Sequence, residues 1–352
     1  MTRSSDIEYK VFFNKVVGRE EVQLLSDAEL QKFFGKSRIL IIGAGGSIGS
    51  ALAKRLIFAK IMNVFFLDHD ESSLHALALE LSGIGASSSN NFFVGDIRDY
   101  QSIKDVVSHV MPTIVVHAAA LKHLAILERF PREGFLTNII GTLNVAEICV
   151  EHNVEQFVNI STDKAANAIS VLGKTKKLGE LITEEIFTNT GLNYCSVRFG
   201  NVFSSRGSVI ETFIHQIRHQ IPVTLTDKRV ARFFMSRNES ANLVLAATSL
   251  KESGTFIQNM GEEVMILDVI NRIAEYLNLK ATIKIVGLKN GEKMHEELFD
   301  GPVLPTRFEP ISRSVHSFRN GLVKEIKQFL PKNNIEALEQ IENLTLTYLK
   351  TV

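Results

Sequence analysis

The sequence has few cysteines, no excess of charge of either sign and no long apolar run. Cys149 and Cys195 are the only two cysteines in 352 residues, too few for a disulfide framework. Both lie in apolar surroundings, so we expect them to be buried thiols. The 39 basic and 39 acidic residues cancel. The net charge therefore indicates neither nucleic acid nor an anionic membrane surface as a partner.

No stretch reaches the ~18 consecutive apolar residues that a membrane helix needs. Residues 1–10 are polar and charged, which is unlike a signal peptide. We therefore expect a soluble, cytoplasmic protein without a membrane span. The chain is longer than one small core requires, which favours one large domain with an appended lobe.

Short apolar runs alternate with helical patterns between residues 37 and 205. A strand is expected at 39–42, where four apolar residues run into a cluster of glycines, and Ser50 begins a helical pattern. The alternation predicts a doubly wound parallel α/β sheet, because parallel strands need helical crossovers. The further strands are expected at 63–68, 91–94, 113–118, 156–161 and 193–199, and the helices at 50–61, 71–81, 103–110, 137–151 and 173–188.

The two ends of the chain do not continue the alternation of strands and helices seen in this central part. Residues 1–36 are predicted to form an N-terminal arm with a helix that Ser26 or Asp27 caps. Residues 37–205 would form the sheet domain. From 206 to 352 the elements are shorter and prolines are more frequent, which indicates a smaller substrate lobe interleaved with the last strands of the sheet.

A glycine-rich turn joins the first predicted strand to the first predicted helix. Glycines there allow a tight turn and a close approach to a pyrophosphate, and the helix N-terminus attracts the phosphates. Asp68 ends the next strand, where an acid can bind the adenosine ribose and would repel the extra phosphate of NADP. This order favours NAD over NADP. The expected cofactor contacts in the turn are Gly43, Gly46, Ser47, Ile48 and Gly49.

The ends of the third and fourth strands supply further candidates for cofactor binding. Asp96 and Ile97 follow the third strand, where an acid could contact the adenine amino group; an ordinary surface acid is the alternative. Ala118, Ala119 and Ala120 follow the fourth strand. Small side chains there would let the backbone pass close to a dinucleotide, although an alanine run also suits core packing.

A hydroxyl, a carboxylate and an amine follow the strand at 156–161. They are Thr162, Asp163 and Lys164, and Lys176 lies on the next predicted helix. Ligands of an open parallel sheet bind at the carboxyl ends of its strands, so these groups are candidates for catalysis. A solvated Asp-Lys pair is the plainer alternative.

At this point the sequence resembles the extended short-chain dehydrogenase/reductases, which have the Rossmann fold. Within them it is similar to the nucleotide-sugar 4,6-dehydratases of polysaccharide and nonulosonate synthesis, the UDP-N-acetylglucosamine 4,6-dehydratase-like or CapD-like group. The resemblance covers about residues 16–300. It rests on VVGREEV at 16–22, GAGGSIGS at 43–50, HAAALKHL at 117–124, TNIIGTLNV at 137–145, STDKAAN at 161–167, VRFGNV at 197–202, SRGSVI at 205–210, RFFM at 232–235 and GEKMHEEL at 291–298.

The resemblance implies a role for each candidate. Asp163 would protonate the leaving hydroxyl, and Lys164 would remove the C5 proton, for which burial or nearby Lys176 should keep it partly neutral. Thr162 would bond the 4-hydroxyl, and Lys176 would hold the nicotinamide ribose. The implied substrate contacts are Lys122, Asn201, Ser208, Val209, Arg232 for the diphosphate and Glu297 for the nucleoside ribose.

The sequence departs from the family pattern at two positions. Leu172 stands four residues before Lys176, where the wider superfamily has a tyrosine, and Ala168 replaces a common proline. Members without the tyrosine indicate retention at C5. A C5-inverting dehydratase, a 4-epimerase and a non-catalytic NAD-binding protein remain alternatives. The superfamily also implies a homo-oligomer. No metal is expected, because adjacent acids such as those at 296–297 point in different directions on a helix.

Overall fold

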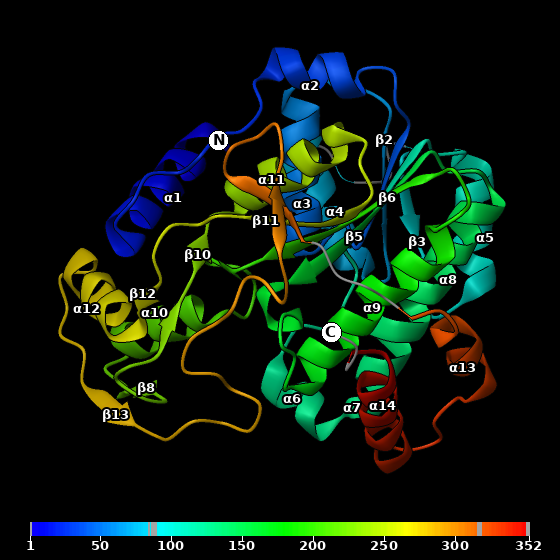
Figure 1. Cartoon of the computed structure of the whole chain (residues 1–352). Helices are drawn as coiled ribbons and strands as arrows, with labels where there is room; N and C mark the ends of the chain where they lie inside the picture. The colour runs from blue at the N-terminus through cyan, green and yellow to red at the C-terminus, as the bar shows by residue number, and fades with distance from the viewer. Residues whose placement is uncertain (1, 84, 86–89, 315–318, 350–352) are drawn as a thin grey trace.

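The computed structural model describes residues 2–83, 85, 90–314 and 319–349. Nine strands form one sheet in the order β14-β15-β11-β6-β5-β4-β1-β2-β3. Figure 1 labels β2, β3, β5, β6 and β11 of this sheet. The run from β3 to β11 is parallel, whereas β15 and β14 are antiparallel. The doubly wound α/β fold is thus confirmed. The strands are β1 (Ile39–Ile42), β2 (Val64–Asp68), β3 (Phe92–Val94), β4 (Ile114–His117), β5 (Gln156–Thr162), β6 (Asn193–Phe199), β11 (Gly254–Gln258), β14 (Val303–Pro305) and β15 (Ile311–Ser314).

The sheet is covered by helices on both faces. Successive strand residues point to opposite faces, so in β1 Ile39 and Ile41 join one core while Leu40 and Ile42 join the other. The first core includes residues of α2 (Asp27–Phe34), α3 (Ser47–Phe58), α4 (Glu71–Ser82) and α11 (Arg237–Leu250). The second includes residues of α5 (Tyr100–Val110), α8 (Gly141–Glu151) and α9 (Val171–Phe187).

Most expected elements are present with small shifts of their ends. The helix after β1, α3, begins at Ser47 rather than at residue 50, directly after the glycine turn. Ser26 caps α2 as expected. The helix expected at 137–151 starts earlier. It is preceded by α6 (Leu124–Arg129), α7 (Pro131–Gly134) and a π-helix over Phe135–Ile140 that continues directly into α8.

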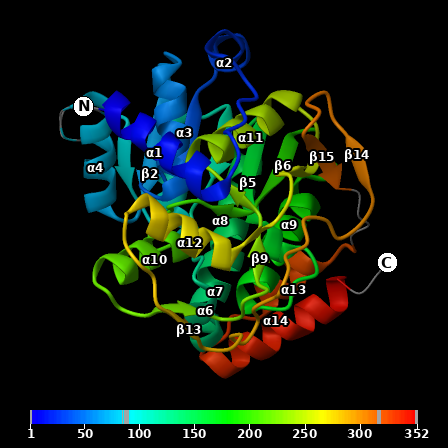
Figure 2. The same ribbon diagram turned by 90° about the vertical axis from the view of Figure 1, so that its left-hand side faces the viewer.

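A second lobe lies beside the sheet. It contains α10 (Val209–Arg218), α12 (Ile266–Tyr276) and three small two-stranded sheets. The helix α1 (Thr2–Val17) lies against α12 (Figure 2), and Phe13, Val16 and Val17 are buried in the core of this lobe. The small sheets pair β7 (Asn201–Val202) with β10 (Phe234–Met235), β8 (Val223–Leu225) with β13 (Ile283–Ile285), and β9 (Ala231–Arg232) with β12 (Val264–Met265).

The C-terminal helices pack against the sheet domain rather than the second lobe. The helices α13 (Leu322–Gln328) and α14 (Asn334–Leu349) lie against α9 (Figure 1). Their side chains share a core with residues of α6, the π-helix, α8 and α9, and Ile341 and Leu344 are fully buried there. Lys174 of α9 pairs with Glu342 of α14. Within the part of the chain that the structure describes, no helix is long and apolar enough to cross a membrane.

We predict that Ile341→Ala lowers the free energy of unfolding by about 2–5 kcal/mol, because it leaves a cavity under α14. Leu346 lies on the same helix with 49% of its side chain exposed, so Leu346→Ala is a matched control that should change little. Urea unfolding measures both. Equal losses in the two variants would show that α14 is not packed as described.

Candidate active site

The turn between β1 and α3 has room for glycine alone at two positions. Gly43 has φ +84°, and a Cβ atom there would lie 2.5 Å from the backbone nitrogen of Ala119. A Cβ at Gly49 would lie 2.2 Å from the carbonyl oxygen of Gly43. The glycines therefore let the turn, the start of α3 and the chain after β4 pack closely.

Asp68 stands at the carboxyl end of β2 and faces this turn. It is 7% exposed, and its carboxylate accepts hydrogen bonds from the backbone N–H groups of Gly45, at 2.9 Å, and Asp70, at 3.1 Å. These bonds fix the carboxylate beside the glycine turn, where an acceptor for ribose hydroxyls is needed.

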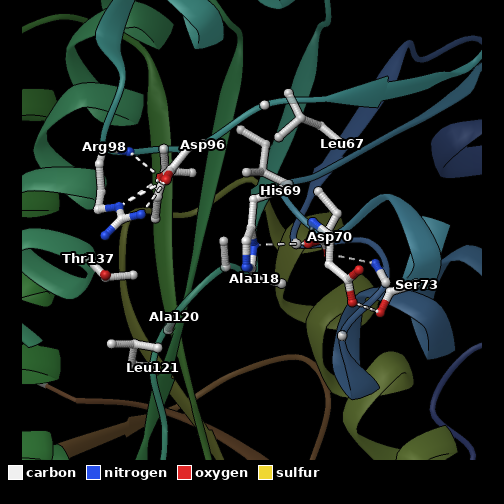
Figure 3. Close-up of a pocket in the computed structure, with 18 of the residues that line it drawn as sticks. Leu67, His69, Asp70, Ser73, Asp96, Arg98, Ala118, Ala120, Leu121 and Thr137 are labelled. Carbon is white, nitrogen blue, oxygen red and sulfur yellow. Dashed lines mark hydrogen bonds and ion pairs between the residues drawn. The ribbon is translucent and has the colours of Figure 1, made fainter. Parts of the chain in front are cut away.

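A first pocket opens at the carboxyl ends of β1, β2, β3 and β4. Figure 3 shows Asp96 and Arg98 on one side of it, and Asp70 and Ser73 on the other. The Arg98 guanidinium beside Asp96 lowers the pKa of that carboxyl group. The expected cofactor residues that line this pocket are Gly43, Gly46, Asp68, Asp96, Ile97, Ala118, Ala119 and Ala120. Gly49 lies behind them in the packing of the turn.

A second pocket joins the first, with Gly46, Ala118, Ala120, Leu121 and Arg206 lining both. Its lining includes four basic side chains and no carboxylate, so it suits an anionic ligand. The basic residues are Lys122, Lys164, Lys176 and Arg206. The other expected site residues in this lining are Ser47, Ile48, Thr162, Asn201, Ser208 and Val209.

The three groups after β5 are connected by hydrogen bonds. Asp163 begins a short 3₁₀ turn, Asp163–Ala165, and its side chain is fully buried behind the pocket wall. Its Oδ1 accepts from Thr162 Oγ1 and from Lys164 Nζ, each at 2.9 Å. Lys164 Nζ also lies 3.3 Å from Asn201 Oδ1 and 3.3 Å from Glu296 Oε1. Thr162 and Lys164 thus face the pocket, with Asp163 supporting them.

The two lysines of the site differ in the direction in which their pKa is shifted. Burial alone would lower the pKa of Lys164. The carboxylates of Asp163 and Glu296 raise this pKa by more than burial lowers it, so it lies above the usual lysine value. Burial lowers the pKa of Lys176 to about 8, with Glu180 opposing the shift. The expectation that burial keeps Lys164 partly neutral is therefore wrong, because two carboxylates pair with it. Lys176 is the lysine that burial affects most.

Leu172 occupies the first turn of α9, one turn before Lys176. Ser170 caps this helix by accepting from the N–H of Gly173 at 3.1 Å. The Leu172 side chain is 6% exposed and lines the second pocket. An apolar side chain cannot exchange a proton, so a hydroxyl at this edge has to come from another residue, such as Thr162.

Comparison with known proteins identifies the family of this chain. The model of a family described as polysaccharide biosynthesis protein matches residues 39–311. The chain belongs to this family. It is 36% identical to the capsular polysaccharide biosynthesis protein CapD of Staphylococcus aureus over 297 residues, 83% of this chain and 49% of CapD. This chain therefore spans about half the length of that curated relative.

Two other relatives are matched over most of their length. A UDP-glucose 4-epimerase of Rickettsia prowazekii is 33% identical over 272 residues, which are 75% of this chain and 78% of the epimerase. The X-ray structure of Pen from Bacillus thuringiensis superposes with a TM-score of 0.69 at 33% identity, covering 76% of this chain and 84% of Pen. These matches extend the similarity to a solved structure of the short-chain dehydrogenase/reductase fold.

Two of the expected substrate residues do not line the pocket in this member of the family. Arg232 is 7% exposed, and its guanidinium donates to the carbonyl oxygens of Ala231, Met294 and Lys293 at 2.7, 3.0 and 2.8 Å. Glu297 is exposed and accepts a hydrogen bond from Asn167 Nδ2. Arg232 thus braces the segment before Glu296 instead of facing the pocket.

The structure also adds two residues that sequence reasoning missed. Arg206 lines both pockets; its backbone N–H donates to Ser47 Oγ at 3.0 Å and its guanidinium donates to Ser73 Oγ at 2.9 Å. The sequence feature that could have indicated Arg206 was its place within the SRGSVI motif. Glu296, next to Lys164, carried no signal that separates it from Glu297. Within residues 2–83, 85, 90–314 and 319–349, no three His, Cys, Asp or Glu side chains group to hold a metal ion.

We predict that Lys176→Met raises the free energy of unfolding at pH 7. In the folded protein burial lowers the pKa of Lys176 to about 8, below the ordinary lysine value of 10.5, so protonation favours the unfolded chain. The penalty is fully present below pH 8 and disappears as the pH rises to 10.5, since the unfolded lysine then also loses its proton. The gain from Lys176→Met should shrink over that interval.

Lys177→Met is the matched control, because Lys177 is equally buried but paired with Asp300 at 2.6 Å. Removing it leaves Arg198 as the one cation paired with the buried carboxylates of Glu180 and Asp300 in the described residues, and should lower the free energy of unfolding. Urea titrations at several pH values measure both variants. A loss of stability in Lys176→Met at pH 7 would contradict the shifted pKa.

Proposed function

We propose that this protein catalyses the NAD-dependent 4,6-dehydration of a nucleotide-linked N-acetylhexosamine, with UDP-N-acetylglucosamine as the favoured substrate. The observation that carries the proposal is the cationic second pocket, which joins the dinucleotide pocket and holds Thr162 and Lys164 in its wall. The product would be a 4-keto-6-deoxy sugar for polysaccharide, nonulosonate or other glycan synthesis.

The first pocket fits a dinucleotide. The glycine turn leaves space that a Cβ atom would fill, and Asp68 stands where the adenosine ribose hydroxyls need an acceptor. A second phosphate on that ribose would meet the carboxylates of Asp68 and Asp70, which favours NAD over NADP. NAD held by these residues would supply a hydride acceptor for sugar carbon C4 and then a hydride donor for C6.

The groups after β5 would handle the protons. Thr162 Oγ1 lines the pocket and donates to Asp163 Oδ1, so a proton from the sugar 4-hydroxyl can pass through Thr162 to Asp163. This path would replace the missing tyrosine at Leu172. The resemblance assigns Asp163 to protonation of the departing 6-hydroxyl, Lys164 to the C5 proton and Lys176 to the nicotinamide ribose.

The nucleoside diphosphate would lie along the second pocket. Lys122 and Arg206 supply positive charge there, and Asn201 and Ser208 supply polar groups. The Ser208 hydroxyl is buried without a hydrogen-bond partner among the described residues, so it is free to meet a ligand. Val209 offers an apolar surface at the same edge.

A 4-epimerase is the second candidate, because the Rickettsia prowazekii relative carries that name. Leu172 disfavours it, since epimerases of this fold depend on the tyrosine.

We favour C5 retention over inversion for the dehydratase. We also propose that the protein forms a homo-oligomer. Its interface would not include the part of α9 that α13 and α14 cover.

The first test is incubation with UDP-N-acetylglucosamine and, separately, GDP-N-acetylglucosamine in deuterated water. We expect one of the two to lose the mass of a water, offset by one deuterium gained at C5. An isomeric product of unchanged carbon-bound mass would instead identify the epimerase. Turnover of neither sugar by protein that binds NAD would favour a non-catalytic role.

We further predict that Asp163→Asn lowers kcat by about 10²–10⁴-fold, the usual contribution of a general acid, with KM within a few-fold of the wild type. Asp268 is exposed on α12, far along the chain from these groups, so Asp268→Asn should leave both constants unchanged. Steady-state kinetics with the active sugar measure the effect. An unchanged kcat in Asp163→Asn would remove Asp163 from the mechanism.

A further inference from the structure

A loop of the second lobe reaches the sheet domain at the place where the two pockets join. Residues 204–208 lie between β7 and α10, and all of them except Ser204 line the second pocket. Arg206 of this loop also lines the first pocket. In the part of the chain that the structure describes, no other residue of the second lobe does so. The side chain of Arg206 is therefore the point at which the second lobe can contact a ligand of the first pocket.

The loop is attached to the sheet domain on two sides. On the side of the glycine turn, the backbone N–H of Arg206 donates to Ser47 Oγ, the first residue of α3, at 3.0 Å. On the side of the segment after β4, Lys122 Nζ donates to Ser205 Oγ at 3.4 Å. The loop thus connects the turn that lines the first pocket to a basic residue that lines the second.

The Arg206 guanidinium extends into the first pocket, where neutral oxygens accept its hydrogen bonds. It donates to Ser73 Oγ at 2.9 Å and to the carbonyl oxygen of Gly45 at 3.4 Å. The Ser73 hydroxyl donates in turn to Asp70, and Figure 3 shows these two side chains together on one side of the pocket. A guanidinium has five N–H donors, so Arg206 keeps donors for a ligand.

The two arginines of the first pocket differ in their partners. Arg98 forms ion pairs with Asp96 and Glu133. The hydrogen bonds of Arg206 to described residues all go to neutral oxygens. A dinucleotide places its pyrophosphate at the glycine turn, directly beside Arg206. Charge-assisted hydrogen bonds are about twice as strong as neutral ones, so the Arg206 guanidinium would gain by exchanging its neutral acceptors for this anion.

We propose that Arg206 binds the pyrophosphate of the dinucleotide and thereby couples the two pockets. Fixing the Arg206 side chain also fixes the loop, and the loop places Ser208 and Val209 at the second pocket. Dinucleotide binding therefore strengthens the binding of a nucleoside diphosphate in the second pocket, and by linkage the nucleoside diphosphate strengthens dinucleotide binding by the same factor. The identity of the second ligand rests on the proposed function, whereas the contact of Arg206 with the dinucleotide rests on the first pocket alone.

Calorimetric titration of protein freed of bound nucleotide measures this coupling without turnover. The probes are NAD and UDP, with GDP titrated in parallel, and the diphosphate that binds is used throughout. In the wild type, saturating diphosphate should lower the Kd for NAD by about fivefold or more. In Arg206→Met the Kd for NAD alone should rise by about tenfold or more, because a charge-assisted contact is lost. The diphosphate should then change that Kd by less than about twofold, since the coupling is removed.

Arg98→Met is the matched control, because it removes an arginine that lines the first pocket but not the second. Whatever its Kd for NAD, this variant should keep the wild-type effect of the diphosphate on that Kd. Arg206→Lys keeps the charge without the planar guanidinium and should regain part of the NAD affinity. Arg206 is exposed, so its variants should fold, and thermal unfolding checks this.

A wild-type Kd for NAD in folded Arg206→Met overturns the contact with the dinucleotide. Full retention of the diphosphate effect in Arg206→Met, or its loss in Arg98→Met, overturns the coupling through Arg206. Wild-type protein that binds no NAD, or neither UDP nor GDP, overturns the proposal as well. Cooperative binding of both ligands without conversion of any sugar would contradict the dehydratase function and still support the coupling.

Discussion

The buried guanidinium of Arg198 joins the three parts of the molecule that build the site. Arg198 lies on β6 and is 1% exposed. It donates twice at 2.7 Å to Glu180 on α9, and to Asp300 in the C-terminal part of the chain at 2.9 and 3.0 Å. Despite burial, which raises it, the pKa of Glu180 falls to about 2 because Arg198 and Lys177 face it. Breaking such a pair from one side leaves an uncompensated charge in the core. Since Lys176 stands one turn before Glu180, this cluster also fixes the position of the Lys176 amine in the wall of the second pocket.

Local sequence signals were sufficient wherever the structure depends on neighbours along the chain. The apolar runs at β1 and β5, the glycine turn and the Ser26 cap lie where they were expected, because strand burial, positive φ and capping act over a few residues. Arg232 is different. Its guanidinium was expected at a diphosphate, yet carbonyl oxygens some 60 residues later in the sequence surround it. Nothing in the residues next to Arg232 encodes that contact. Glu296 and Glu297 differ for the same reason: adjacent side chains point in different directions, and the fold alone decides which one is buried.

The N-terminal VVGREEV motif, to which the sequence alone assigned no contact, connects to Lys164 through a chain of contacts. Arg19 pairs with Glu239, which completes the capping box of α11, and donates to the carbonyl oxygen of Phe234 at 2.7 Å. Phe234 opens β10, which pairs with β7, and Asn201 of β7 contacts Lys164. The arm thus braces the strand pair that carries one wall of the second pocket. A substitution at Arg19 would act on the site through this path without touching a ligand.

The charged side chains differ between the two pockets. The first pocket carries Asp68, Asp70, Asp96 and Glu133, acceptors that suit hydroxyls and an amino group but repel an added phosphate. The second is lined by four basic side chains, with its carboxylates Asp163 and Glu296 held behind the wall. Arg206 belongs to both linings and lies at their junction. Under the proposed function, the ribose hydroxyls of the dinucleotide would meet the carboxylates of the first pocket, and the diphosphate of the sugar nucleotide would meet the cations of the second.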